Sequence, residues 1–222
     1  MKFAVAYSTG KDSALALWRM MQDGHEPVCL IVNINREAGR SWFHGINYEL
    51  LDAVSERMGI PLIKCASTGE NYHTEFEKGL LQAAARGAEA CVFGDIDIDE
   101  HLEWNQARCE TAGVKCIVPL WKQNREKLVY ELLDAGIQAV IKCVESKFIG
   151  DELLGKTLDR DVVELIRATG SDICGENGEY HTFVYGGPMF HAPVNFRGGK
   201  IIDFGTHSVI DLLPLIEQEP EE

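Results

Sequence analysis

The sequence predicts an α/β protein in which a parallel sheet is flanked by helices and a smaller α+β lobe follows at the C-terminus. Short runs rich in β-branched residues alternate with longer segments of helical period, which is the pattern of an α/β fold. Most of these short runs are apolar without interruption, as expected for strands that are buried on both faces of a sheet. From residue 171 onward glycines become frequent and the alternation stops, which indicates a change of architecture.

The alternating elements occupy the first part of the chain. Strands are expected at residues 3–7, 28–34, 62–65, 90–93 and 115–118. Helices are expected at residues 12–23 and 48–58, in a segment that ends near residue 86, and at 103–111. Gly24 ends the first of these helices, and the turn Gly59-Ile60-Pro61 ends the second.

The C-terminal part has a different pattern of predicted helices and strands. Helices are expected at 125–134 and 161–169, a strand at 139–144, and short strands around 182–184 and 201–204. We place the boundary between residues 121 and 124, which gives two domains, 1–122 and 123–222. The acidic end at 220–222 is expected to be a frayed tail.

Composition limits the classes of partner. The net charge is −14, from 35 acidic against 21 basic residues. This charge opposes broad contact with nucleic acid, which requires Lys and Arg to neutralise phosphates. The seven cysteines are scattered without a C-x-x-C pair, as in a reducing compartment. No signal peptide and no run of membrane-spanning length is apparent, so we expect a cytoplasmic protein with no membrane partner.

The strongest local signal is a polar loop between the first predicted strand and the first predicted helix. Its residues are Ser8, Thr9, Gly10, Lys11, Asp12 and Ser13. Backbone amides at a helix N-terminus attract anions, Gly10 permits close approach, and Lys11 adds a charge. Asp12 could cap the helix or hold a magnesium ion. The loop is not a Walker A motif, which requires G-x-x-x-x-G-K-[ST]. The sequence therefore predicts a phosphate-binding loop of another type.

This loop resembles the SGGKDS signature of the PP-loop ATP pyrophosphatases, with Thr9 where the second residue is usually glycine. Further motifs make the chain similar to the diphthine–ammonia ligase family. They are Gly94-Asp95-Ile96, Arg108-Cys109-Glu110, Pro119-Leu120-Trp121, the segment LGKTLD at 154–159, CGENGEYHT at 174–182 and GPMF at 187–190. His181 stands where many relatives are expected to have glutamate.

The resemblance implies a Rossmann-like, HUP-type sheet that binds ATP in residues 1–122 and a substrate-recognition lobe in 123–222. It implies an ATP-dependent ligase that adenylates a carboxylate, releases pyrophosphate, and then amidates the acid with ammonia. The family's acceptor is diphthine, a modified histidine on elongation factor 2. ATP, Mg²⁺ and ammonium are the implied small-molecule partners.

The same resemblance assigns roles to residues. The catalytic candidates are Lys11, Asp12, Glu176 and Glu179. The ATP-binding candidates are the loop residues 8–13 with Asn33, His44, Gly94, Asp95 and Arg108. The substrate candidates are Glu176, Glu179 and His181, and the metal candidates are Asp12 and Asp95. Asn33 ends a strand, where its backbone groups could meet an adenine edge by analogy of fold.

Three other functions stay open at this stage. The chain could adenylate a different acid, act as a PP-loop RNA-modifying enzyme, or bind ATP or AMP as a sensor without catalysis. The acidic net charge and the absence of C-x-x-C count against RNA modification. A homodimer is compatible with a chain of this size.

Overall fold

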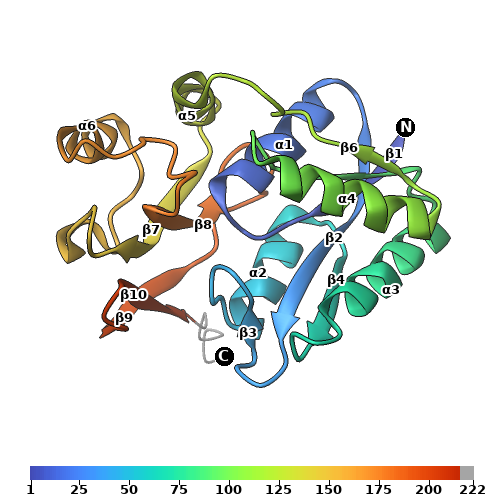
Figure 1. The fold of residues 1–222 in the computed structure, drawn as a ribbon, viewed down its shortest axis with the longest axis horizontal. Helices are drawn as coiled ribbons and strands as arrows, with labels where there is room; N and C mark the ends of the chain where they lie inside the picture. The colour runs from blue at the N-terminus through green and yellow to red at the C-terminus, as the bar shows by residue number, and fades with distance from the viewer. Residues whose placement is uncertain (216–222) are drawn as a thin grey trace, which may run out of the picture.

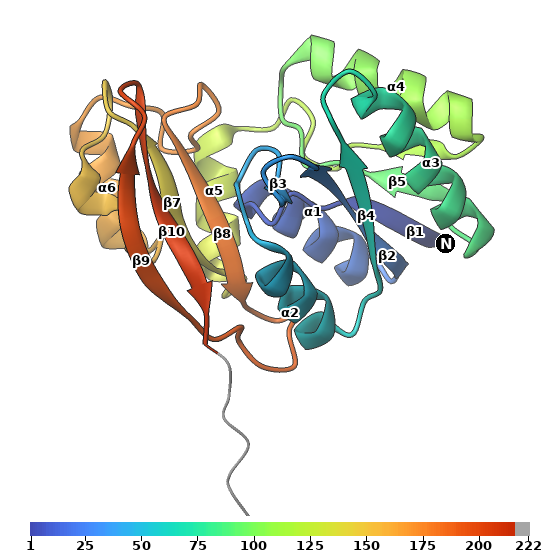
Figure 2. The ribbon, with the colours of Figure 1, turned by 90° about the horizontal axis from the view of Figure 1, so that it is seen from below.

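The computed structural model describes residues 1–215, which form two β-sheets with helices around them (Figures 1 and 2). The predicted tail at 220–222 lies outside the described residues. The larger sheet consists of β1 (Lys2–Ala6), β2 (Glu26–Asn35), β3 (Arg40–Ser41), β4 (Leu62–Ser67), β5 (Ala90–Val92) and β6 (Lys115–Ile117). Its parallel strands run in the order β4-β2-β1-β5-β6, and β3 is an antiparallel addition to β2. The expected parallel sheet is confirmed.

Helices cover both faces of this sheet. They are α1 (Lys11–Gln22), α2 (Tyr48–Met58), α3 (Tyr72–Ala85) and α4 (Asp99–Ala112). Strand residues alternate between two apolar clusters because successive side chains point to opposite faces. Phe3 and Val5 pack in the cluster that contains α1 and α2, whereas Ala4 packs with α3 and α4. This order of five strands with helices on both faces is the Rossmann-like arrangement.

The second sheet is antiparallel and has the order β8-β7-β10-β9. Its strands are β7 (Gln138–Glu145), β8 (Tyr180–Gly186), β9 (Phe196–Asp203) and β10 (His207–Pro214), accompanied by α5 (Arg125–Asp134), α6 (Arg160–Ala168) and a short 3₁₀ helix at Asp151–Leu153. The strands β3 and β10 were not predicted from the sequence. β3 is only two residues long. The side chains of β10 alternate between buried and partly exposed, but the apolar run Leu-Leu-Pro at its end hides this alternation in the sequence.

The two sheets share a continuous core. Leu15 of α1, Leu128 of α5 and Phe183 of β8 belong to one apolar cluster. The predicted domain boundary falls in the connection between β6 and α5. The apolar core continues across this connection, so the division into two domains stays a prediction. In residues 1–215, no helix combines the length and the apolar character that crossing a membrane requires.

Gly94 sets how closely the larger sheet approaches the start of α1. It lies two residues after the end of β5, and a Cβ atom there would lie 2.5 Å from the amide nitrogen of Ser13 and 2.6 Å from the carbonyl carbon of Asp12. Both neighbours are backbone atoms, so neither can rotate away. Only glycine lets this loop pass against the first turn of α1.

We therefore expect Gly94→Ala to displace the first turn of α1 and lower the free energy of unfolding by about 1–3 kcal/mol. Chemical denaturation measures the loss, and nucleotide titration measures the damage to the loop. Gly113→Ala is the control for nucleotide binding: residue 113 caps α4 at φ +69° with nothing within 4 Å of a Cβ atom, so backbone strain lowers its stability but leaves the loop and its nucleotide affinity unchanged. Nucleotide binding that survives in Gly94→Ala would contradict this account.

Candidate active site

One cavity of about 530 Å³ lies where the carboxyl ends of the parallel strands face the second sheet. Its wall contains residues at or just after the ends of β1, β2 and β5, and residues of α3 and α4. The opposite wall comes from the loop before β8 and from β8 itself: Gly175, Glu176, Gly178, Tyr180, His181 and Thr182. Open α/β sheets bind ligands at this edge. The cavity therefore brings the predicted phosphate loop and the predicted substrate motif together.

The phosphate loop is braced by serine hydroxyl groups and by β8. Ser8 Oγ accepts a hydrogen bond from the amide of Gly10 at 3.2 Å, and Ser13 Oγ donates to the carbonyl of Gly10 at 2.9 Å. Gly10 is the N-cap of α1, whose first N–H groups have no partner inside the helix. These groups form the kind of site that binds an anion.

Thr9 has a different role from the rest of the loop. Its side chain is fully buried, it does not line the cavity, and its carbonyl accepts a hydrogen bond from Val184 N of β8 at 2.8 Å. Its φ is +70°, a left-handed conformation that is rare for a β-branched residue. Glycine, the residue that the SGGKDS signature has at this position, adopts this conformation without strain.

Lys11 is enclosed by acceptors. The residue is 5% exposed, and Nζ donates to both carboxylate oxygens of Asp12, at 2.8 and 2.6 Å. Cys174 Sγ is 3.8 Å from the same nitrogen. Burial alone would lower the pKa of Lys11, but Asp12, with smaller contributions from Cys174, Tyr180 and Glu176, holds it well above its ordinary value. The ammonium group is therefore charged at every physiological pH.

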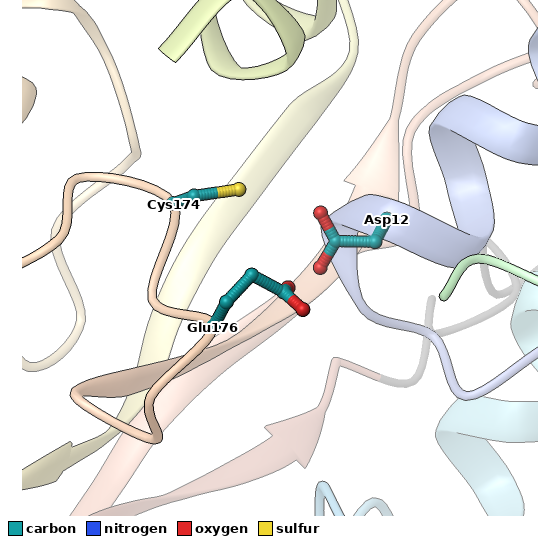
Figure 3. A group of neighbouring side chains, drawn as sticks. All are labelled: Asp12, Cys174 and Glu176. Carbon is teal, nitrogen blue, oxygen red and sulfur yellow. The ribbon is translucent and has the colours of Figure 1, made fainter. Parts of the chain in front are cut away.

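Asp12, Cys174 and Glu176 form a group that could hold a metal ion. One ligand atom of each lies within 4.8 Å of the others, and Figure 3 shows the two carboxylates directed toward each other from α1 and from the loop before β8. Burial and the charge of Asp12 raise the pKa of Glu176 to about 7, against the opposing charges of Lys11 and Arg125. Burial raises the pKa of the Cys174 thiol to about 12. The two carboxylates suit Mg²⁺, which prefers oxygen ligands, whereas the protonated thiol does not.

Asp95, the other metal candidate, lies in the cavity wall with both carboxylate oxygens engaged. Asn105 Nδ2 donates to Oδ2 at 2.7 Å, and His101 Nδ1 lies 3.0 Å from Oδ1. The structure thus places Glu176, rather than Asp95, in the acidic group with Asp12.

Glu179 does not line the cavity. It is 3% exposed, and its carboxylate accepts hydrogen bonds from the backbone amide of Asp172 at 3.1 Å and from that of Asn177 at 3.0 Å. The side-chain amide of Asn177 adds a third at 2.9 Å. Glu179 therefore shapes the loop that carries Glu176, and the structure does not bring it to a substrate.

The far end of the cavity is aromatic. Its side chains are Trp42, Phe43, Tyr72, Phe76, Phe93 and Trp104. Asn33 Nδ2 donates to the Tyr72 hydroxyl at 2.7 Å, whereas Asn33 Oδ1 is buried with no partner among residues 1–215. The Asn33 carbonyl already accepts from the amide of Trp42 at 3.0 Å. The side-chain oxygen of Asn33, and not its backbone carbonyl, is therefore the acceptor left without a partner among residues 1–215.

The remaining candidate site residues differ in whether they line the cavity. Gly94, His44 and His181 line the cavity. Arg108 does not: its Nη1 lies 3.1 Å from Glu77 Oε1 and 3.1 Å from His73 Nδ1. Sequence reasoning gave no role to Cys174 and Thr182, although both lie in the CGENGEYHT segment. It could not find Tyr72 and Trp104, because no local motif surrounds them.

The fold and the loop at the start of α1 place the chain in the PP-loop class of α/β ATP-binding proteins. Family models described as diphthamide synthase N-terminal domain and diphthamide synthase C-terminal domain match residues 1–116 and 124–212. The chain therefore belongs to the diphthamide synthase family, an enzyme family.

Curated relatives agree with this family. The human protein named diphthine–ammonia ligase is 25% identical over 228 residues, covering 91% of this chain and 85% of its own. The Danio rerio protein of the same name is 26% identical, covering 95% and 89%. A solved structure titled as a predicted subunit of a tRNA methyltransferase from Methanocaldococcus jannaschii gives a TM-score of 0.44 at 15% identity, covering 85% of this chain and 98% of its own.

We expect Glu179→Gln to act on the loop rather than on chemistry. The variant would turn an amide NH₂ toward backbone donors, which should lower the free energy of unfolding by about 1–3 kcal/mol. Glu103→Gln, at an exposed position of α4, should change it by less than about 0.5 kcal/mol. Loss of activity in Glu179→Gln without any loss of stability would show that the carboxylate acts on substrate instead.

Glu176 should make Mg²⁺ binding depend on pH. Its pKa of about 7 means that protons compete with the metal below pH 7. The affinity for Mg²⁺ should fall by up to about tenfold per pH unit there and level off above pH 7. Calorimetric titration with Mg²⁺ and a non-hydrolysable ATP analogue measures this. Glu176→Gln should flatten the profile, Glu103→Gln should not, and an unchanged profile in Glu176→Gln would refute the assignment.

Proposed function

We propose that this protein is an ATP-dependent carboxylate–ammonia ligase. It adenylates a carboxylate with release of pyrophosphate, and ammonia then displaces AMP to give an amide. The acceptor is diphthine on elongation factor 2 or a related acid, as the names of the curated relatives suggest. The observation that carries the proposal is that one cavity has the phosphate loop on one wall and the CGENGEYHT segment on the other.

The phosphate end of the cavity supports the first half-reaction. A carboxylate is a poor acyl donor until AMP makes its oxygen a good leaving group, and charge then develops on the departing pyrophosphate. The amides at the start of α1 and the ammonium of Lys11 are positioned to neutralise that charge. Asp12 and Glu176 would hold Mg²⁺, which supplies further positive charge at the phosphates when bound.

Lys11 has to exchange Asp12 for a phosphate group as its hydrogen-bond acceptor before it can take part in the reaction. In this structure its ammonium is bonded to Asp12 and lies between Asp12 and Cys174, so it occupies one of the two carboxylates that would hold a metal ion. A triphosphate offers Lys11 alternative oxygen acceptors of higher charge. Release of Asp12 would then free that carboxylate for Mg²⁺, so that nucleotide and metal binding favour each other.

The aromatic end suits the adenine base. Flat rings line it, and the buried Asn33 Oδ1 lacks a hydrogen-bond donor among the described residues. An exocyclic amino group such as that of adenine would supply one. A buried acceptor left without a donor costs about 1–3 kcal/mol, so this bond would add affinity and select against a base that lacks an amino group.

The test is to incubate the protein with ATP, Mg²⁺ and ammonium, with and without diphthine-bearing elongation factor 2, and to separate AMP from ADP. AMP that forms only with the factor supports the ligase and its acceptor together. AMP that forms with another acid keeps the chemistry and discards diphthine. ATP binding without AMP under every condition favours a sensor and overturns the proposal.

Lys11→Met should slow AMP formation by about 10²–10³-fold, because the variant keeps the volume of the side chain but removes its charge. Lys127→Met, at an exposed position of α5, is the matched control and should keep the parent rate. Thermal melting checks that both variants fold. A parent rate in Lys11→Met would exclude the proposed role.

A further inference from the structure

The imidazole of His44 rests on the glycine of the phosphate loop. A Cβ atom on Gly10 would lie 2.6 Å from Cε1 and 3.0 Å from Nε2 of the His44 ring. The backbone of Gly10 is extended, at φ −82° and ψ 164°, a conformation that any residue can adopt. Glycine is therefore needed at residue 10 for space and not for conformation, because a side chain there would collide with the imidazole.

Hydrogen bonds fix the ring and the loop that carries it. His44 Nδ1 lies 2.7 Å from the carbonyl oxygen of Thr182, and a carbonyl only accepts, so Nδ1 carries the proton. The amide of Ser41 donates to the carbonyl of Ile46 at 2.8 Å, and the Ser41 hydroxyl accepts from the amide of Ile46 at 3.0 Å. The amide of Gly45 donates to the carbonyl of Ser41 at 3.0 Å. The imidazole therefore has a defined tautomer and a braced position before a ligand enters.

The other ring nitrogen, Nε2, is an acceptor without a donor. In the part of the chain that the structure describes, the one hydrogen bond of the His44 ring is the bond from Nδ1. Burial above all lowers the pKa of His44 to about 3, so the ring is neutral at physiological pH. His44 lines the cavity, and Thr182 already occupies its Nδ1 edge. The edge left for a ligand is the one with the lone pair of Nε2.

A phosphate oxygen cannot fill this position. The oxygens of an ionised triphosphate only accept hydrogen bonds, and an acceptor that faces another lone pair is repelled. The group that meets Nε2 therefore has to be a donor, although it lies beside the phosphate loop.

The order of residues in the loop indicates which donor this is. Trp42 and Phe43, directly before His44, contact the Tyr72 ring of the aromatic end, with 6.0 and 6.5 Å between ring centroids. His44 itself contacts Gly10 of the phosphate loop. These three consecutive residues thus span the cavity from its aromatic end to its phosphate end. In a nucleotide the ribose lies between the base and the phosphates, and its hydroxyl groups are donors.

We propose that His44 Nε2 accepts a hydrogen bond from a ribose hydroxyl group of the bound nucleotide, and that His44 thereby selects a sugar that carries this hydroxyl. The contact rests on the proposed function only in that the protein binds ATP. It assigns His44 a part in specificity that differs from phosphate binding and from recognition of the base.

The test compares ATP, 2′-deoxy-ATP and 3′-deoxy-ATP by calorimetric titration of the full chain, with Mg²⁺ and without acceptor acid or ammonium. The analogue that leaves Nε2 without a donor should bind about 5–50-fold more weakly than ATP. His44→Asn retains an amide donor that can reach the Thr182 carbonyl, but it has no acceptor at the position of Nε2, so it should lose this preference. His25→Asn, outside the cavity, is the matched control and should keep it.

NMR of the wild-type protein with ¹⁵N-labelled histidine tests the same contact without a variant. ATP should move the Nε2 resonance of His44 upfield, as expected for a ring nitrogen that accepts a hydrogen bond, and the weaker analogue should move it less. This measurement decides the question if His44→Asn does not fold, and an Nε2 resonance that ATP leaves unchanged overturns the proposal.

The affinities give equally clear outcomes. The weaker analogue identifies the hydroxyl group that donates. Equal affinities of the wild-type protein for the three nucleotides, or a preference that persists in His44→Asn, overturn the proposal. Because the titration contains no acceptor acid, a protein that shows the preference but makes no AMP would refute the ligase and leave the contact standing. A protein that binds none of the three nucleotides overturns both.

Discussion

The contact between β8 and the loop that connects β1 to α1 is the constraint on which the site depends. Two hydrogen bonds make it: the carbonyl of Thr9 accepts from Val184 N at 2.8 Å, and the amide of Lys11 donates to Thr182 Oγ1 at 3.0 Å. Thr9 adopts a left-handed φ to reach β8. The same strand carries His181, and the loop before it carries Glu176. Moving β8 would therefore separate the phosphate loop from every residue of the opposite wall.

Charge is distributed unevenly along the cavity. At the start of α1, Asp12 and Glu176 lie close together, and the resident ammonium of Lys11 balances them. Next to these carboxylates, the ammonium of Lys11 and the N–H groups at the start of α1 make the surroundings positive. A metal–phosphate complex carries both signs of charge. An acidic position and a cationic position side by side are complementary to such a ligand, which a uniformly acidic or basic cavity would not be.

Two glutamates of the CGENGEYHT segment look equivalent in the sequence but have different surroundings in the structure. Glu176 is directed into the cavity, and its pKa is raised to about 7 by burial and by Asp12. The carboxylate of Glu179, three residues later, accepts hydrogen bonds from the backbone amides of Asp172 and Asn177. The second glutamate fixes the loop so that the first can face Asp12. Such support of a functional side chain by a buried hydrogen-bond network is what holds a site in one geometry.

The sequence by itself determined the parallel sheet, its helices and the phosphate loop, because strand and helix periods and the capping of a strand–helix turn are local properties. It also indicated His44, His181 and Glu176 as site residues. Only the tertiary structure decided that Glu176 joins Asp12, that Glu179 and Arg108 bond to other partners, and that the side-chain oxygen of Asn33 has no partner among residues 1–215. Pairing and burial depend on residues more than 100 positions apart, as for Lys11 and Thr182. The local sequence does not encode which of Glu176 and Glu179 accepts hydrogen bonds from backbone amides.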